Sequence, residues 1–403
     1  MQQILGWYLL LTARVRMFAL VVCGLVTLSS CGLPTWAAGG RALDDVVFLR
    51  TRDQARAVVI FSHNMDFQQR SALAFAGPDV TRRTYAAWRG GMEHAQVAFT
   101  REGTVAFATV DELITVTDRV QRTRRSVPKQ QSGAIGRPYA LPDGEFAFYF
   151  NVGFDKSPAD YRTRFEYLSG RTSDEVPGVG IINGQCRPGL VAGVAWPGAT
   201  DPGLRGRLSP FRLDASGVQT LPPLSPEYSP SLLDDTVPCV GDKLPLLHTP
   251  RTDLSDGGAH RLSLIDVNTG QRRVVPLSFP KGEPLTKPDD PANNPISMTV
   301  ADDQLVWVAS RGQVYSTSTR TGATRRLTHL APDGVDGDHI TVMDASDGKL
   351  FIYDKPLNRA GEIRVYDALT GAISERFATP AVDAAVRGVN QHAFPTGIAL
   401  RGA

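Results

Sequence analysis

This sequence of 403 residues lacks long apolar segments, local metal-binding motifs and an excess of charge of one sign. Its 43 lysine and arginine residues nearly balance its 41 aspartate and glutamate residues. That balance argues against a nucleic-acid partner, which favours a clear basic excess. No two of the seven histidines are three or four residues apart, so no local zinc motif is present. Helical periodicity is also weak after residue 40, which favours β-structure.

What the sequence does contain is a repeat with a period of about 50 residues, the spacing expected of β-propeller blades. Hairpin turns of one kind fall near residues 78, 120, 170, 216, 269, 321 and 370. They alternate with continuously apolar strand pairs, such as the one that contains Phe146–Phe150. We therefore predict an all-β, seven-bladed β-propeller, with six or eight blades as alternatives. The tail, Phe394–Leu400, should pair with the first blade and close the ring, which removes open sheet edges.

Two of these turns share a pattern, Asp266-Val267-Asn268-Thr269-Gly270 and Asp367-Ala368-Leu369-Thr370-Gly371. The pattern resembles the repeat of bacterial YVTN and pyrroloquinoline-quinone-like propellers, and the overall plan resembles propeller lipoproteins of high-GC Gram-positive bacteria. The resemblance implies a surface-exposed propeller but no shared activity. The adjacent cysteines and the tryptophan-containing docking motif of the quinone enzymes are missing, which argues against quinone chemistry. We predict no cofactor.

Arginine pairs follow four of the turns, where the outermost strand of a blade should begin. The pairs are Arg82-Arg83, Arg124-Arg125, Arg272-Arg273 and Arg325-Arg326. One interpretation is that these charges protect exposed strand edges against aggregation. The alternative is a basic belt that meets anionic lipid head groups or wall polymers.

Polar residues at the entrances of innermost strands form a candidate ligand site at the mouth of the central channel. Its members are Glu93, His94, Asn183, Asp235, Asn294, His339 and His392. Together they could bind a polar ligand or a metal, and the alternative is an ordinary solvated channel. A separate candidate for Ca²⁺ is the segment with Asp333, Asp336 and Asp338, although loops rich in aspartate and glycine also occur for turn chemistry alone.

The N-terminal segment indicates export. An apolar stretch over residues 17–28 is too short to span a bilayer comfortably and ends in Leu28-Ser29-Ser30-Cys31-Gly32. This ending resembles the bacterial lipobox, which implies that Cys31 is lipidated and becomes the mature N-terminus. An ordinary secretory signal cut near Ala37-Ala38 and an uncleaved anchor remain as alternatives.

The resulting domain organisation has three parts. A lipoprotein signal peptide covers residues 1–31, a flexible tether rich in small residues covers 32–43, and the propeller covers 44–403. We expect strands and turns from Asp44 onward.

Only four cysteines are present, and Cys186 and Cys239 are the two that remain after Cys23 and Cys31. Each lies three residues before an inner-hairpin turn, at Gly189 and at Asp242. They should therefore lie at the same place on the inner strands of the fourth and fifth blades. We predict a disulfide with a Cα separation near the upper limit of about 7 Å, and two buried free thiols are the alternative.

These patterns favour a monomeric, extracytoplasmic lipoprotein, anchored in the cell membrane, that acts as a non-catalytic binding or scaffold module. Its partner would be a protein or a cell-envelope ligand. Two alternatives stay open. One is a metal-dependent enzyme of the lactonase or lyase type at the channel mouth, and the other is a sensor of anionic envelope polymers or lipids.

Overall fold

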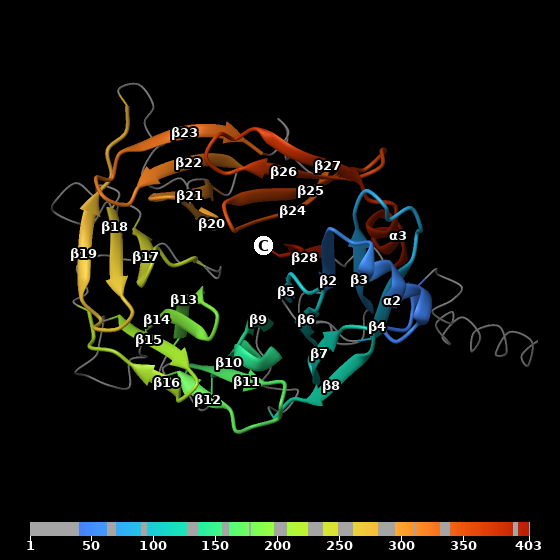
Figure 1. The fold of residues 1–403 in the computed structure, drawn as a ribbon, viewed down its shortest axis with the longest axis horizontal. Helices are drawn as coiled ribbons and strands as arrows, with labels where there is room; N and C mark the ends of the chain where they lie inside the picture. The colour runs from blue at the N-terminus through green and yellow to red at the C-terminus, as the bar shows by residue number, and fades with distance from the viewer. Residues whose placement is uncertain are drawn as a thin grey trace, which may run out of the picture.

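Seven mainly antiparallel sheets surround a central axis in this computed structural model (Figure 1). The structure describes residues 40–62, 70–89, 95–126, 136–154, 161–176, 179–196, 208–224, 237–248, 261–280, 295–309, 312–330, 339–389 and 394–402. One sheet forms each blade, so the chain is a seven-bladed β-propeller, as predicted.

Blades are numbered here from the N-terminus, and the strands of each are given from the axis outward. Blade 1 contains β28 (Phe394–Leu400), β2 (Ala57–Ser62), β3 (Arg70–Ala76), β4 (Tyr85–Arg89) and β1 (Gly40–Arg41). Blade 2 contains β5 (Val97–Phe99), β6 (Val105–Ala108), β7 (Glu112–Val116) and β8 (Val120–Arg124). Blade 3 contains β9 (Gly136–Ala140), β10 (Phe146–Phe154), β11 (Tyr161–Tyr167) and β12 (Asp174–Val176), with a 3₁₀ turn at Pro142–Gly144.

The remaining four blades repeat this plan. Blade 4 contains β13 (Val179–Arg187), β14 (Leu190–Trp196), β15 (Ser209–Asp214) and β16 (Gly217–Thr220). Blade 5 contains β17 (Lys243–His248), β18 (Arg261–Asp266) and β19 (Arg272–Pro276). Blade 6 contains β20 (Pro295–Ala301), β21 (Gln304–Ala309), β22 (Gln313–Ser318) and β23 (Thr324–His329). Blade 7 contains β24 (His339–Ser346), β25 (Lys349–Pro356), β26 (Glu362–Asp367) and β27 (Ile373–Ala378).

All seven predicted outer turns lie where the sequence placed them, and the shared motif has a local cause. In both complete copies, one carboxylate oxygen of the aspartate accepts two backbone N–H groups and the threonine hydroxyl at 2.8–3.1 Å. These hydrogen bonds, foremost that from Thr370, lower the pKa of Asp367. The final glycine then has a positive φ, +73° at Gly270 and +70° at Gly371, a conformation that L side chains rarely adopt.

The ring is closed by the last strand, as predicted. β28 pairs antiparallel with β2, from Ala57 opposite Leu400 to Ser62 opposite Phe394. An ion pair supports the same seam, because the Arg56 guanidinium contacts both carboxylate oxygens of Glu375 at 2.9 and 3.0 Å. Arg56 also donates to the carbonyl of Arg401 at 2.7 Å, so at one end of the pairing it joins blade 7 to the chain segments of both strands.

Two helices differ from the expectation of strands and turns from Asp44 onward. The first, α2 (Val46–Asp53), begins where the Asp45 side chain accepts the N–H groups of Val47 and Phe48. Its β-branched residues favour a strand, but the cap and the burial of Phe48 against Phe75, with ring centroids 5.0 Å apart, favour the helix.

The second helix, α3 (Pro380–Gly388), lies between blade 7 and the closing strand and packs mainly on β3 (Figure 1). Proline at its first position has the φ that a helix requires there, and the buried residues Ala381, Val382 and Ala385 lie on one face. Neither this helix nor any other in the described ranges is long and apolar enough to cross a membrane.

The structure corrects the edge-protection interpretation for the second arginine pair, Arg124-Arg125. Arg124 ends β8 rather than beginning it, and the Arg125 side chain is fully buried between blades 2 and 3. Its guanidinium lies 3.3 Å from Glu166, 3.1 Å from the Val110 carbonyl and 3.6 Å from the Phe150 ring centroid. Burial lowers the pKa of Arg125, and the Glu166 carboxylate opposes that effect. Arg125 therefore joins two blades and does not protect an edge.

Apolar side chains fill the spaces between neighbouring blades. Phe75 of blade 1 contacts Phe99 of blade 2, and Phe165 of blade 3 contacts Phe211 of blade 4, each with ring centroids 6.1 Å apart. The inner strands are buried on both faces, which explains their continuously apolar sequences.

We predict that deleting residues 394–403 makes the protein aggregate or lowers its melting temperature strongly. The deletion removes β28 and leaves β2 with an open edge. The control is Phe394→Ala, because that side chain is 60% exposed and its loss should change stability by less than about 0.5 kcal/mol. A soluble, monomeric deletion variant that melts at the wild-type temperature would contradict the role of β28.

We also predict that Glu166→Gln lowers the free energy of unfolding by about 3 kcal/mol, because it leaves the Arg125 charge buried without a partner. The matched control is Glu112→Gln, which breaks the solvent-accessible Arg122–Glu112 pair on the outer strands of blade 2 and should cost less than about 1 kcal/mol. If urea unfolding shows that both variants lose the same free energy of unfolding, the buried pair stabilises the fold no more than the solvent-accessible pair does.

Candidate functional site

Two of the seven residues predicted at the channel mouth belong to the described part of the chain. Asn183 lies on β13 of blade 4, and His339 begins β24 of blade 7. The other five, Glu93, His94, Asp235, Asn294 and His392, lie outside the described residues, as do Asp333, Asp336, Asp338 and Cys31. The ligand, metal and lipid assignments of those residues stay predictions.

Asn183 takes part in contacts between three blades. Its side-chain oxygen accepts a hydrogen bond from the Tyr139 hydroxyl of β9, and its backbone carbonyl accepts the Val237 N–H at 3.0 Å. The residue is only 5% exposed. Asn183 therefore holds the inner strand of blade 4 to blade 3 and to the segment that leads into blade 5.

His339 contacts a chain of charged groups across blade 7. Its Nδ1 lies 2.7 Å from one oxygen of Asp354, and the Arg364 guanidinium donates to the other oxygen at 2.7 Å. Arg364 in turn lies 3.3 Å from Glu362, which also contacts Arg376 at 3.6 Å. The nearly buried Asp354 carboxylate is thus held between the His339 ring and the Arg364 guanidinium, and all three residues belong to blade 7.

A polar cavity of about 220 Å³ lies where inner strands of blades 1, 2, 3 and 7 meet near the axis. Arg137 of β9 reaches Asp344 of β24 at 3.9 Å, although blades 1 and 2 separate their blades in the ring (Figure 1). Asp344 also accepts the Ser297 hydroxyl of β20 at 2.7 Å. One carboxylate therefore connects blades 3, 6 and 7.

The walls of this channel cavity are otherwise fixed by neutral hydrogen bonds. Gln96 donates to the Thr396 carbonyl at 3.0 Å, and the Thr396 hydroxyl donates to the Ala95 carbonyl at 2.8 Å. The Nη1 atom of Arg137 is buried and finds no hydrogen-bond partner among the described residues. The Arg137 Nη1 group can therefore donate a hydrogen bond to one small polar molecule in the cavity. The charges of Arg137 and Asp344 already offset each other, so the cavity has no surplus charge to attract an ion.

The predicted disulfide is present and connects blades 4 and 5. Cys186 of β13 is bonded to Cys239, with Cα atoms 4.6 Å apart rather than near the expected upper limit. The short distance follows from Gly184, where a Cβ atom would come within 1.7 Å of the Val237 carbonyl oxygen. Because glycine has no side chain, the segment entering blade 5 can lie directly against β13.

No group of three or more histidine, cysteine, aspartate or glutamate side chains that could hold a metal occurs in the described ranges. Sequence reasoning missed Arg137 and Asp344, because their contact depends on the ring geometry. The start of an inner strand at Gly136-Arg137 was the only local signal.

No protein-family model and no curated protein matches the chain. Similar solved structures include AztD from Citrobacter koseri, 12% identical with a TM-score of 0.43, over 85% of this chain and 97% of AztD. BamB from Moraxella catarrhalis is 13% identical with a TM-score of 0.42, over 79% and 87% of the two chains. Acylaminoacyl peptidase from Pyrococcus horikoshii is 12% identical with a TM-score of 0.46, over 79% and 50%. These similarities are too low to assign a function, and the fold assignment comes from the seven sheets.

We predict that the double variant Cys186→Ser, Cys239→Ser unfolds with a free energy about 4 kcal/mol lower than wild type. The bond closes a loop with a sequence separation of 53, and the chain-entropy relation gives that loss. As a control, dithiothreitol should lower the melting temperature of wild type and leave that of the double variant unchanged. Two reactive thiols per mature chain in denatured, unreduced protein would rule the bond out.

Proposed function

We propose that the protein is an extracytoplasmic binding module, anchored by lipid at Cys31, that presents ligand contacts on a rigid seven-bladed disc. The observation that carries the proposal is that polar groups near the axis are used to join blades. Asp344 connects three blades, and Asn183 contacts two neighbours. Such a scaffold is preformed, so little ordering entropy opposes binding at its surface.

The disulfide supports a location outside the cytoplasm. Disulfides form and persist in oxidising compartments, whereas cytosolic thiols are kept reduced. The Cys186–Cys239 bond joins two blades in the folded chain, which suits a structural role. It agrees with the signal-peptide pattern that ends at Cys31.

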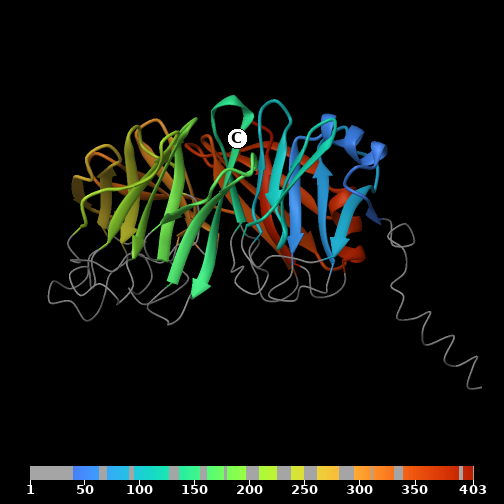
Figure 2. The same ribbon diagram turned by 90° about the horizontal axis from the view of Figure 1, so that it is seen from below.

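Connection lengths suggest which face binds. In an antiparallel blade, the second and fourth strands end at the same face of the ring (Figure 2). Connections that follow second strands include residues 63–69 after β2 and 197–208 after β14, whereas first and second strands are joined by two-residue turns at 302–303 and 347–348. Because long loops on a rigid scaffold commonly carry function, we expect partner contacts on the face with the longer connections.

We predict that Cys31→Ala releases the protein from the membrane fraction and abolishes acyl labelling in a Gram-positive expression host. Without its thiol, residue 31 cannot receive the lipid. Cys23→Ala is the matched control, since it changes a cysteine of the same apolar leader and should leave fractionation unchanged. A Cys31→Ala protein that stays with the membrane, beside a wild-type N-terminus without an acyl chain, would contradict the anchor.

The binding role has its own experiment. Intact cells are treated with a crosslinker, and the disc is captured beside an unrelated lipoprotein of similar abundance. Enrichment of one envelope protein or polymer with the disc alone is the expected result. Equal recovery with both baits would overturn the proposal of a specific partner.

A further inference from the structure

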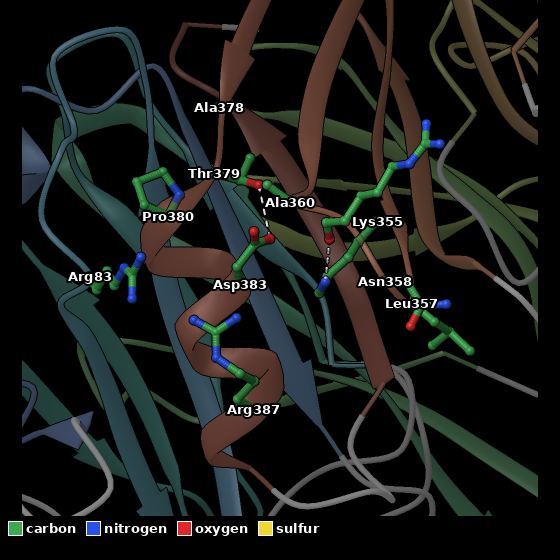
Figure 3. Close-up of a pocket in the computed structure, with 11 residues that line it drawn as sticks. Arg83, Lys355, Leu357, Asn358, Ala360, Ala378, Thr379, Pro380, Asp383 and Arg387 are labelled. Atoms are coloured by element: carbon green, nitrogen blue, oxygen red, sulfur yellow. Dashed lines mark hydrogen bonds between the residues drawn. The ribbon is translucent and has the colours of Figure 1, made fainter.

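A second cavity, of about 460 Å³, lies on the outer side of the closing seam between α3 and the β25–β26 turn. Its lining includes four cationic side chains and one carboxylate. They are Arg83, Lys355, Arg359 and Arg387, with Asp383 as the carboxylate. Figure 3 shows Arg83 beside Pro380 at the start of α3, and Arg387 with its guanidinium directed along the helix toward Asp383.

The single carboxylate in this cavity is fully engaged by the fold. Asp383 is 5% exposed and accepts the Tyr353 and Thr379 hydroxyls at 3.1 Å and the Gly361 N–H at 2.9 Å. Burial raises the pKa of Tyr353, so this hydroxyl stays protonated and donates. Asp383 therefore fixes α3 to blade 7, and no described ion pair joins it to Arg83 or Arg387.

Three further carboxylates of blade 7 are already paired with arginines. Arg56 contacts Glu375, and Arg364 contacts Asp354 and Glu362. Arg83, Arg359 and Arg387, by contrast, have no carboxylate partner among the described residues. The outer side of the seam thus keeps an excess of positive charge around a cavity.

Lys355 adds a fixed donor to the cavity wall. It is 7% exposed, and its ammonium donates to the carbonyl of Arg359 at 2.8 Å (Figure 3) and to that of Pro356 at 3.3 Å. An ammonium group has three N–H donors, so one is left for a ligand. The N-cap residue Thr379 and Pro380 at the first position of α3 also line the cavity.

We propose that this cavity binds a phosphate ester, with its phosphoryl group between Arg83 and Arg387 and its organic part against Leu357, Ala360 and Pro380. A phosphate monoester carries between one and two negative charges near neutral pH, which suits the surplus of cations, and guanidinium groups bind its oxygens in pairs. The volume falls within the usual range for small organic ligands, about 300–1,000 Å³. This inference rests on the proposed binding function and names its ligand chemistry.

Calorimetry on the full chain in detergent tests the site, with glycerol 3-phosphate as probe and glycerol as the uncharged comparison. Wild type should bind the phosphate ester and not glycerol. Arg83→Gln and Arg387→Gln should each weaken binding by about tenfold or more, because each removes a charged donor. The matched control is Arg325→Gln on β23, another exposed arginine without a described partner, which should bind as wild type does. All three variants should melt at the wild-type temperature, which shows that a change in affinity does not come from unfolding.

Three results would overturn the proposal: no binding to wild type, wild-type affinity in both Arg83→Gln and Arg387→Gln, or equal affinity for malonate, a dicarboxylate of similar charge. Competition on the Cys31→Ala protein without detergent, which would dissolve the vesicles, then separates the sources of the phosphoryl group. If phosphatidylcholine vesicles containing phosphatidylglycerol displace glycerol 3-phosphate and vesicles of phosphatidylcholine alone do not, the ligand is a membrane head group. If neither displaces it, the ligand is a soluble ester. Binding by Cys31→Ala would show that the site persists even where the anchor proposal fails.

Discussion

The pairing of β2 with β28 is the contact on which the rest of the molecule depends. It joins residues near 57 to residues near 400, so β2 has no open edge toward the axis once it forms. The Arg56–Glu375 pair and the docking of α3 on β3 act at the same seam. Because blade 1 takes its innermost strand from the C-terminus, it cannot be completed until the whole chain is present. Contacts between such distant segments also favour slow folding.

Charged side chains have three distinct roles in this ring. Arg125 and Glu166 are buried between blades, where an ion pair fixes geometry and the loss of one partner is costly. Arg137 and Asp344 meet near the axis and connect blades that are not neighbours. The arginines of the outer cavity lack carboxylate partners in the described part of the chain, so their charge remains available to a ligand. The same residue type therefore stabilises the fold at one site and leaves binding capacity at another, according to burial and partners.

The blade count, the outer turns, the closing strand and the cysteine pair could be predicted because each has a local or periodic signal. The aspartate of Asp266-Val267-Asn268-Thr269-Gly270 makes its turn through its own hydrogen bonds, so the sequence alone specifies it. Helix α2 could not be predicted in this way, since its β-branched residues favour a strand and burial of Phe48 decides otherwise. Helix α3 did carry a signal in Pro380 and the buried positions that follow. The two cavities depend on contacts between blades, which no local pattern encodes.

The disulfide has a consequence for local opening. The segment around Val237 and Cys239 is held to β13 by one covalent bond and by the hydrogen bond to the Asn183 carbonyl, made possible by Gly184. Reduction would remove the covalent restraint at this junction while leaving β28 in place. Opening should then occur as a sub-global fluctuation between blades 4 and 5, with faster amide hydrogen exchange there than elsewhere in the ring. A closed ring can in this way have a single redox-dependent hinge without losing its closure.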